Sequence, residues 1–130
     1  MEIEMEQIKR LEDELPVCTE KWGWKYHHFG VPTEEVKENE KYIKSAKLYV
    51  SGFYSSPFGV EWMRWERDSA YHPLVKTVPH LAFVVDNLDL ELKKHKFNVI
   101  VSPNSMPDSM RVAFIEFNGA PIELMEFKEL

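Results

Sequence analysis

The sequence predicts an α+β fold built from two similar halves in tandem, and two observations support this prediction. Each half opens with a short histidine-containing strand, KYHHFGVP at 25–32 and TVPHLAFVVDNLD at 77–89, and a polar, helix-compatible stretch follows each strand. Each half then closes on paired aromatic and β-branched runs, which is the composition of a β-hairpin. A repeated order of strand, short helix and hairpin is typical of a duplicated α+β domain.

A helical extension is predicted to precede the two halves. Ile8, Leu11 and Leu15 recur at helical spacing between charged residues, which predicts an amphipathic helix over residues 6–15 that ends at Pro16. A lid over a pocket is the alternative use of such a helix, and packing against the core is the commoner one.

The closing strands of the two halves match residue by residue. Gly59-Val60-Glu61-Trp62-Met63 corresponds to Pro121-Ile122-Glu123-Leu124-Met125, and Asn118-Gly119 before the second strand is a strong signal for a hairpin turn. Fewer residues separate the opening strand from the hairpin in the first half, so its helix or second strand is expected to be truncated. The chain is therefore divided into an extension (1–24), a first module (25–65), a polar linker (66–76) and a second module (77–130).

Composition excludes several classes of protein. A chain of 130 residues is long enough for one domain, and a formal net charge of −6 without a basic stripe argues against nucleic-acid binding. No apolar run is long enough to cross a bilayer, and the acidic N-terminus differs from a signal peptide. Cys18 is the only cysteine, so no internal disulfide is possible and a cytoplasmic location is expected.

Two glutamates stand in the middle of predicted strands with apolar neighbours. Because side chains alternate between faces, Glu61 shares a face with Met63, and Glu123 shares one with Met125. Burying an unpaired carboxylate costs roughly several kcal/mol, so each glutamate needs a partner, a proton or a metal ion.

Two histidines occupy matching positions at the opening strands of the halves. A single such histidine is usually structural, and a single glutamate in an antiparallel strand usually faces water. The combination is more informative, because equivalent places in two matching halves suit a metal site with approximate twofold symmetry. Two imidazoles and two carboxylates suit Zn²⁺, Ni²⁺, Co²⁺, Fe²⁺ or Mn²⁺. We therefore predict a divalent-metal site formed by His28, Glu61, His80 and Glu123.

These motifs resemble those of the vicinal-oxygen-chelate superfamily, which includes glyoxalases, bleomycin resistance proteins and extradiol dioxygenases. HHFGVP and PHLAFVVDNLD resemble its opening strands, while GVEWMRW and GAPIELMEF resemble its closing strands. The resemblance covers residues 25–127 and is stronger in the second half. It implies two tandem βαβββ modules whose mixed sheet curls around a metal-binding cleft, and a homodimer.

The resemblance also implies which side chains hold the ion. Glyoxalase-like members use all four positions, extradiol dioxygenases and fosfomycin-resistance enzymes use three (here His28, His80 and Glu123), and bleomycin-binding members use no metal. Retention of Glu61 favours the glyoxalase or epimerase pattern, although epimerases often have glutamine there. The stretch VPTEEVKENEKY lacks the aromatic-rich helix and Leu-Gly turn of glutathione-using members, so glutathione recognition is not expected.

Three other side chains lie near this pattern. His27 competes with His28 as the first ligand, because a one-residue slip exchanges the faces of a strand, and His28 is favoured since the apolar run follows it directly. Tyr71 and His72 fall in the linker, where exposed positions are expected, although they could line the cleft.

Three functions follow as hypotheses. The first is a lyase or isomerase related to lactoylglutathione lyase, in which Glu123 or Glu61 removes a proton next to a metal-polarised carbonyl of a small substrate. The second is an Fe²⁺-dependent dioxygenase. The third is a non-catalytic module that binds an apolar ligand between the sheets. None of the three involves nucleic acid or a membrane.

Overall fold

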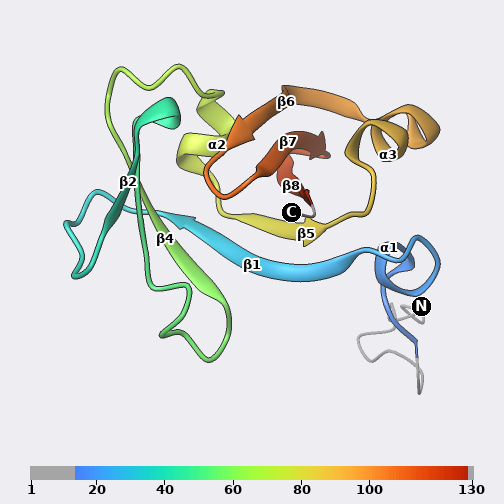
Figure 1. Cartoon of the computed structure of the whole chain (residues 1–130), viewed down its shortest axis with the longest axis horizontal. Coiled ribbons are helices and arrows are strands. Elements are labelled where there is room, and N and C mark those ends of the chain that lie inside the picture. The colour runs from blue at the N-terminus through green and yellow to red at the C-terminus, as the bar shows by residue number, and fades with distance from the viewer. Residues whose placement is uncertain (1–13, 129–130) are drawn as a thin grey trace, which may run out of the picture.

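The computed structural model describes residues 14–128, which form one mixed sheet of eight strands in the order β2-β3-β4-β1-β5-β8-β7-β6. The sheet curls, so that its two ends rise on the same side (Figure 1). The first half contains β1 (Lys25–Pro32), β2 (Lys41–Ile43), β3 (Leu48–Ser51) and β4 (Val60–Trp65). The second half contains β5 (His80–Val84), β6 (Asn98–Met106), β7 (Met110–Phe117) and β8 (Ala120–Phe127).

The two halves repeat one topology about the centre of the sheet. β1 and β5 pair antiparallel, β4 lies parallel to β1, and β8 lies parallel to β5. Antiparallel partners follow on each side, β3 and β2 in the first half and β7 and β6 in the second. The duplicated α+β fold with a curled mixed sheet, predicted from the sequence, is confirmed.

Helix α3 (Leu88–His95) covers the outer face of the second half. The Asn87 side chain caps its N-terminus by accepting a hydrogen bond from the Leu90 amide at 3.0 Å. Leu124 and Ile122 of β8 pack into the apolar cluster beneath this helix, together with Trp24, Phe83, Leu88 and Ile115. Side-chain alternation along β8 therefore turns Glu123 and Met125 to the opposite, inner face.

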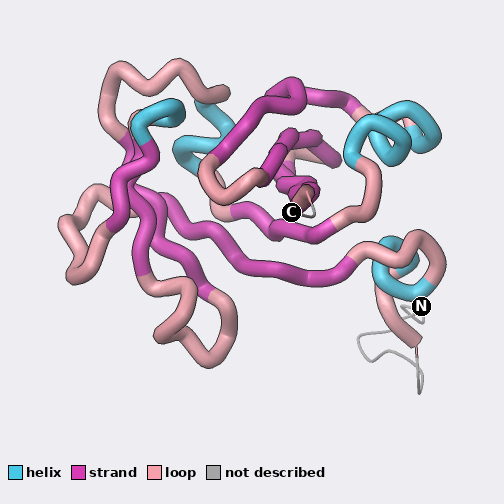
Figure 2. Tube along the Cα trace, viewed as in Figure 1, coloured by secondary structure: helices cyan, strands magenta, loops and turns pink. Residues whose placement is uncertain are grey.

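The first half has no helix corresponding to α3, which agrees with the truncation expected from the short spacing between its opening strand and its hairpin. Residues 33–40 connect β1 to β2 as a loop, and only the 3-10 turn η1 (Lys44–Ala46) lies between β2 and β3. The loop covers the outer face with polar contacts: Lys37 lies over the Trp62 ring at 4.6 Å, and Glu40 accepts two hydrogen bonds from Arg64 at 2.7 and 2.8 Å. Figure 2 shows how few helical segments accompany the strands.

The β7–β8 hairpin has the predicted turn. Asn118 and Gly119 both adopt positive φ angles, 50° and 85°, as a type I′ turn requires. This turn fixes the β7–β8 register, in which Glu123 lies opposite Phe114.

Only part of the N-terminal extension falls within the described residues. The helix predicted over residues 6–15 lies almost entirely outside them, and the described part contains the short helix α1 (Val17–Glu20) directly after Pro16. The linker similarly contains the start of a short helix, α2 (Pro73–Thr77). Among the described residues, none of the helices is long and apolar enough to cross a membrane.

Trp24 ties the extension to α3 and supports a stability prediction. Its indole Nε1 donates a 2.6 Å hydrogen bond to the buried Glu91 carboxylate. Replacing Trp24 with phenylalanine removes this donor, and we expect the free energy of unfolding to fall by about 1.5–3 kcal/mol in urea titrations. Trp22→Phe is the matched control, because it changes a neighbouring indole and leaves the Trp24–Glu91 bond in place. Equal losses in the two variants would contradict a specific role for this bond.

Candidate metal centre

The central β1–β5 pairing positions the two histidines. His28 lies opposite Ala82, and His80 lies opposite Gly30, so the pairs are related by the approximate twofold axis between the strands. His28 and His80 are 2% and 1% exposed, and their rings lie 5.5 Å apart.

The two glutamates occupy corresponding places in the flanking parallel strands. Glu61 of β4 lies beside Gly30 of β1, and Glu123 of β8 lies beside Ala82 of β5. The same register on both sides of the seam therefore directs one glutamate from each half toward the histidines.

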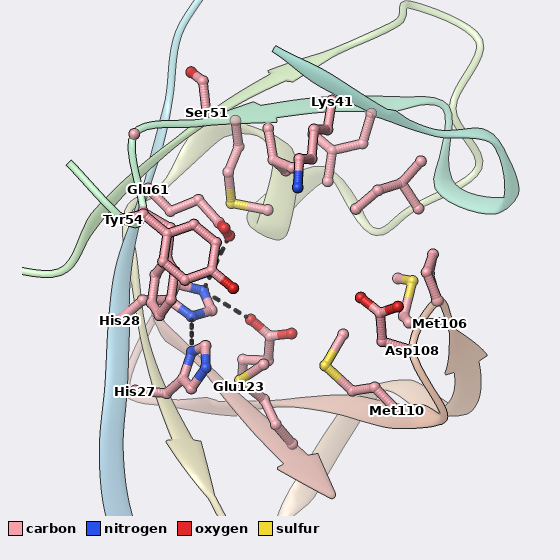
Figure 3. A pocket seen from close by; sticks show the side chains of 18 of the residues that line it. His27, His28, Lys41, Ser51, Tyr54, Glu61, Met106, Asp108, Met110 and Glu123 are labelled. Carbon is pink, nitrogen blue, oxygen red and sulfur yellow. Dashed lines mark hydrogen bonds and ion pairs between the residues drawn. The ribbon is translucent and has the colours of Figure 1, made fainter. Parts of the chain in front are cut away.

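The four side chains converge on the inner face of the sheet, and Figure 3 shows three of them, His28, Glu61 and Glu123, directed toward one another. Glu123 Oε1 lies 3.0 Å from His80 Nε2 and 3.2 Å from His28 Nε2, and Glu61 Oε1 lies 3.5 Å from His28 Nε2. His28, His80 and Glu123 each offer one ligand atom within 4.8 Å of the others. Glu61 is held more loosely, since its side chain is 19% exposed and that of Glu123 is 9% exposed.

Burial and nearby charges shift the pKa values of the two glutamates in opposite directions. Burial alone would raise the pKa of Glu123, but hydrogen bonds and charge from His28 and His80 lower that pKa to about 2. Burial raises the pKa of Glu61, and the charge of His28 opposes this only in part. Burial lowers the pKa of His28, but the Glu123 carboxylate reverses this and leaves the pKa above its usual value. The site therefore keeps Glu123 ionised, whereas the pKa of Glu61 lies above its ordinary value.

The donor atoms fit a divalent ion. His28 Nε2 is buried and makes no aligned hydrogen bond with any described residue, although two carboxylates lie close to it. Ligand atoms placed tetrahedrally at Zn²⁺ distances lie about 3.3–3.6 Å apart, close to the observed His28–Glu spacings. Two nitrogen and two oxygen donors suit the borderline ions of the first transition series.

Gly30 makes room for one of these rings. A Cβ atom at Gly30 would lie 2.2 Å from Cε1 of the His80 imidazole, far inside van der Waals contact. The absence of a side chain at this position is therefore required for His80 to face the centre.

A cavity of about 450 Å³ opens next to the centre. Every methionine among the described residues lines it, and aromatic side chains complete its apolar wall. Lys41 and Asp108 project from opposite walls toward the open space, away from the histidines (Figure 3). The cavity can thus hold an apolar group beside the centre and polar groups at its far side. The methionines that line the cavity are Met63, Met106, Met110 and Met125.

The linker residues are placed differently from the sequence expectation. Tyr71 is half-buried and lines the cavity, and its hydroxyl donates a 3.0 Å hydrogen bond to Asn104 Oδ1. Burial, together with the charge of Glu123, raises the pKa of Tyr71 to about 12, so its proton stays in place at neutral pH. His72 is also half-buried and caps α2 by accepting from the Leu74 amide. Neither residue had a periodic pattern around it that could have predicted this burial.

His27, the alternative to His28 in the sequence, also lines the cavity. It stands outside the quartet, and its Nδ1 lies 2.7 Å from His28 Nδ1.

Comparisons with known proteins agree with this architecture. The chain has the fold of the vicinal-oxygen-chelate superfamily. It is similar to methylmalonyl-CoA epimerase from Mycobacterium tuberculosis, with a TM-score of 0.58 and 15% identity over 81% of this chain and 89% of that one. It is also similar to the hypothetical protein BH1468 from Bacillus halodurans, with a TM-score of 0.58 and 17% identity over 82% of this chain and 96% of that one. No protein-family model and no curated protein sequence matches the chain.

The contact between Gly30 and His80 gives a second prediction. Gly30→Ala should displace the His80 ring, lower the free energy of unfolding by about 1–3 kcal/mol and weaken Zn²⁺ binding. Urea unfolding and Zn²⁺ titration measure the two effects. In a His80→Ala background the ring is gone, so Gly30→Ala should then cost little stability. An undiminished cost in that background would contradict this assignment of the clash.

The ion pair at the centre gives a third prediction, for the metal-free protein. The pKa of Glu123 is lowered on folding, so its contribution to stability is present above pH 4.5 and is lost as the pH falls toward 2. The pKa of His28 is raised, so its contribution is present below pH 6.5 and is lost as the pH rises through the raised value. Glu123→Gln should therefore cost most, about 3–5 kcal/mol, between these limits. Urea unfolding with a chelator across this pH range measures the difference, and a difference independent of pH would contradict the assignment.

Proposed function

We propose that this chain is a metal-dependent isomerase or lyase that moves a proton at a carbon next to a carbonyl group of a small molecule. The observation that carries this proposal is the convergence of His28, His80, Glu61 and Glu123 beside an apolar cavity. The fold it shares with an epimerase supports the isomerase class. A glutathione-derived substrate, the glyoxalase pattern, has no such support.

His28, His80 and Glu123 would hold the ion, with Glu61 as a fourth ligand that can detach. A divalent ion held there would polarise a carbonyl oxygen and make the neighbouring C–H bond more acidic. A substrate with two adjacent oxygen atoms suits this arrangement, because both atoms can approach from the cavity side.

Glu61 is the better candidate for the proton-transferring group. Two imidazoles, those of His28 and His80, hold the Glu123 carboxylate. Within the described chain the Glu61 carboxylate has one ion-pair partner, His28, at 3.5 Å. Burial raises the pKa of Glu61, which makes its carboxylate a stronger base when it is ionised. Glu61 would take the proton from the substrate carbon and return it in the second step.

The cavity restricts the rest of the substrate. Its methionine side chains are flexible and apolar, so they can adapt to an aliphatic or aromatic body beside the reacting carbon. The surrounding apolar wall excludes water from the reacting atoms, which strengthens the electrostatic interactions there.

Substitution of Glu61 tests this proposal. Glu61→Gln should keep the fold and most of the metal affinity, because the amide oxygen can still face the ion but the amide cannot accept the proton near neutral pH. We expect loss of substrate C–H exchange with D₂O by about 10²–10⁴-fold, measured by NMR on α-hydroxycarbonyl compounds with added Zn²⁺, Ni²⁺, Co²⁺ or Mn²⁺.

Glu123→Gln is the matched control, since it should weaken metal binding itself. A parent protein that holds metal but exchanges no C–H proton in any compound of this panel would contradict the isomerase or lyase proposal. Such a protein that instead captures apolar ligands tightly would be a binding module.

A second function is favoured by one observation. His28, His80 and Glu123 alone form the tighter group, which is the two-histidine, one-carboxylate set of Fe²⁺ oxygenases. An oxygenase of this kind should consume O₂ with an aromatic diol in the presence of Fe²⁺ and should tolerate Glu61→Gln. Loss of O₂ uptake only in Glu123→Gln would support this alternative.

We also infer a cytoplasmic homodimer. The single cysteine, Cys18, supports a reducing compartment. Exposed aromatic side chains of the β3–β4 loop, Tyr54 at 91% and Phe58 at 77%, support association with a second copy. Sedimentation equilibrium measures the mass in solution.

A further inference from the structure

His27 is the extra residue of a β-bulge in β1. Against β5, Tyr26 pairs with Phe83 and His28 pairs with Ala82, so two steps along β1 correspond to one step along β5. In a regular strand His27 and His28 would point to opposite faces. The bulge interrupts that alternation and turns both rings toward the cavity, where Figure 3 shows them side by side.

The two imidazoles are joined through their Nδ1 atoms, which lie 2.7 Å apart. A hydrogen bond between two ring nitrogens needs a hydrogen on one and a lone pair on the other. His28 directs Nε2 toward the two carboxylates, and a metal ion at that place requires the Nε2 lone pair. With an ion bound at Nε2, the hydrogen of His28 would reside on Nδ1 and be donated to His27 Nδ1.

His27 is itself held in place for this contact. Its ring stacks on Phe53 with centroids 4.7 Å apart and planes inclined by 9°, and the Phe127 ring lies 5.8 Å away. These contacts limit rotation of the His27 ring, so its Nδ1 remains directed at His28.

In the described part of the second half, no side chain stands behind His80 as His27 stands behind His28. The approximate twofold axis relates His28 to His80, so the position equivalent to His27 is Pro79. His80 Nδ1 is buried and makes no hydrogen bond with a described residue. The His80 ring is instead fixed by packing against Phe114, 5.0 Å away, and by the space at Gly30.

We propose that His27 is a positioning residue that fixes the tautomer and orientation of His28 and thereby sets how tightly the centre holds its ion. The inference rests on the proposed metal centre and deepens it. A hydrogen-bond acceptor behind a ligand imidazole raises its basicity and restricts the ring, and loss of such a partner weakens metal binding about 10–100-fold.

Zn²⁺ affinity, measured by competition with a chromophoric chelator, tests the proposal. His27→Phe keeps a ring that can stack on Phe53 but removes the acceptor, and we expect a 10–100-fold rise in Kd. His27→Gln keeps an oxygen that can accept from His28 and should retain most of the affinity. Tyr26→Phe is the matched control next in sequence. The Tyr26 hydroxyl donates to the Phe58 carbonyl and Tyr26 does not line the cavity, so the affinity of this variant should equal that of the parent.

A second readout separates tautomer control from general loosening of the site. In the Zn²⁺-loaded protein labelled with ¹⁵N-histidine, NMR should show a hydrogen on His28 Nδ1 and a coupling between the two Nδ1 nuclei. Equal Zn²⁺ affinities of the parent and His27→Phe would overturn the inference and leave the proposed centre standing. A His28 that carries its hydrogen on Nε2 would overturn both, because Nε2 then has no lone pair for the ion. A parent protein that takes up no Zn²⁺ would overturn both.

Discussion

Burial of the Glu123 carboxylate between two imidazoles is the interaction on which the rest of the centre depends. Removing this carboxylate from water costs roughly several kcal/mol unless charged or hydrogen-bonded partners offset that cost. The carboxylate and its two imidazole partners come from three different strands, β8, β1 and β5, so their positions depend on the register of the central sheet. A one-residue slip of any of these strands would turn its side chain to the other face. The geometry of the centre therefore depends on the strand register, and the buried ion pairs in turn favour that register.

Approximate symmetry brings the four side chains together, and departures from it give them different roles. Glu123 is fixed by both imidazoles, whereas Glu61 is looser and more exposed. His28 has the imidazole of His27 behind it, and the equivalent position behind His80 is Pro79. Under the proposed function Glu123 would hold the ion and Glu61 would move a proton, a division that a fully symmetric site could not provide.

Much of this arrangement was predictable from the sequence, because it depends on the alternation of side chains between the two faces of a strand. Alternation along the closing strands indicated that Glu61 accompanies Met63 and that Glu123 accompanies Met125, and all four line the cavity. Asn118-Gly119 determined the last hairpin. Those features are local in sequence, so single-residue chemistry is sufficient to predict them.

Features that depend on a break in the pattern or on distant contacts were not predictable. The bulge at His27 places adjacent histidines on one side, contrary to the alternation expected in a strand. Tyr71 is half-buried because its ring packs against Trp65 of β4 and Phe114 of β7. The need for glycine at position 30 arises from His80, far away in sequence. Each of these results from tertiary packing, which the local sequence does not encode.

The most direct test of the central claim is element-resolved metal analysis of the protein purified without chelator and without an immobilised-metal column. The account predicts close to one divalent transition-metal ion per chain, retained through dialysis, and its loss in His80→Ala. A correctly folded parent protein that contains no such ion, and takes up none when offered Zn²⁺, Ni²⁺, Co²⁺, Mn²⁺ or Fe²⁺, would contradict it.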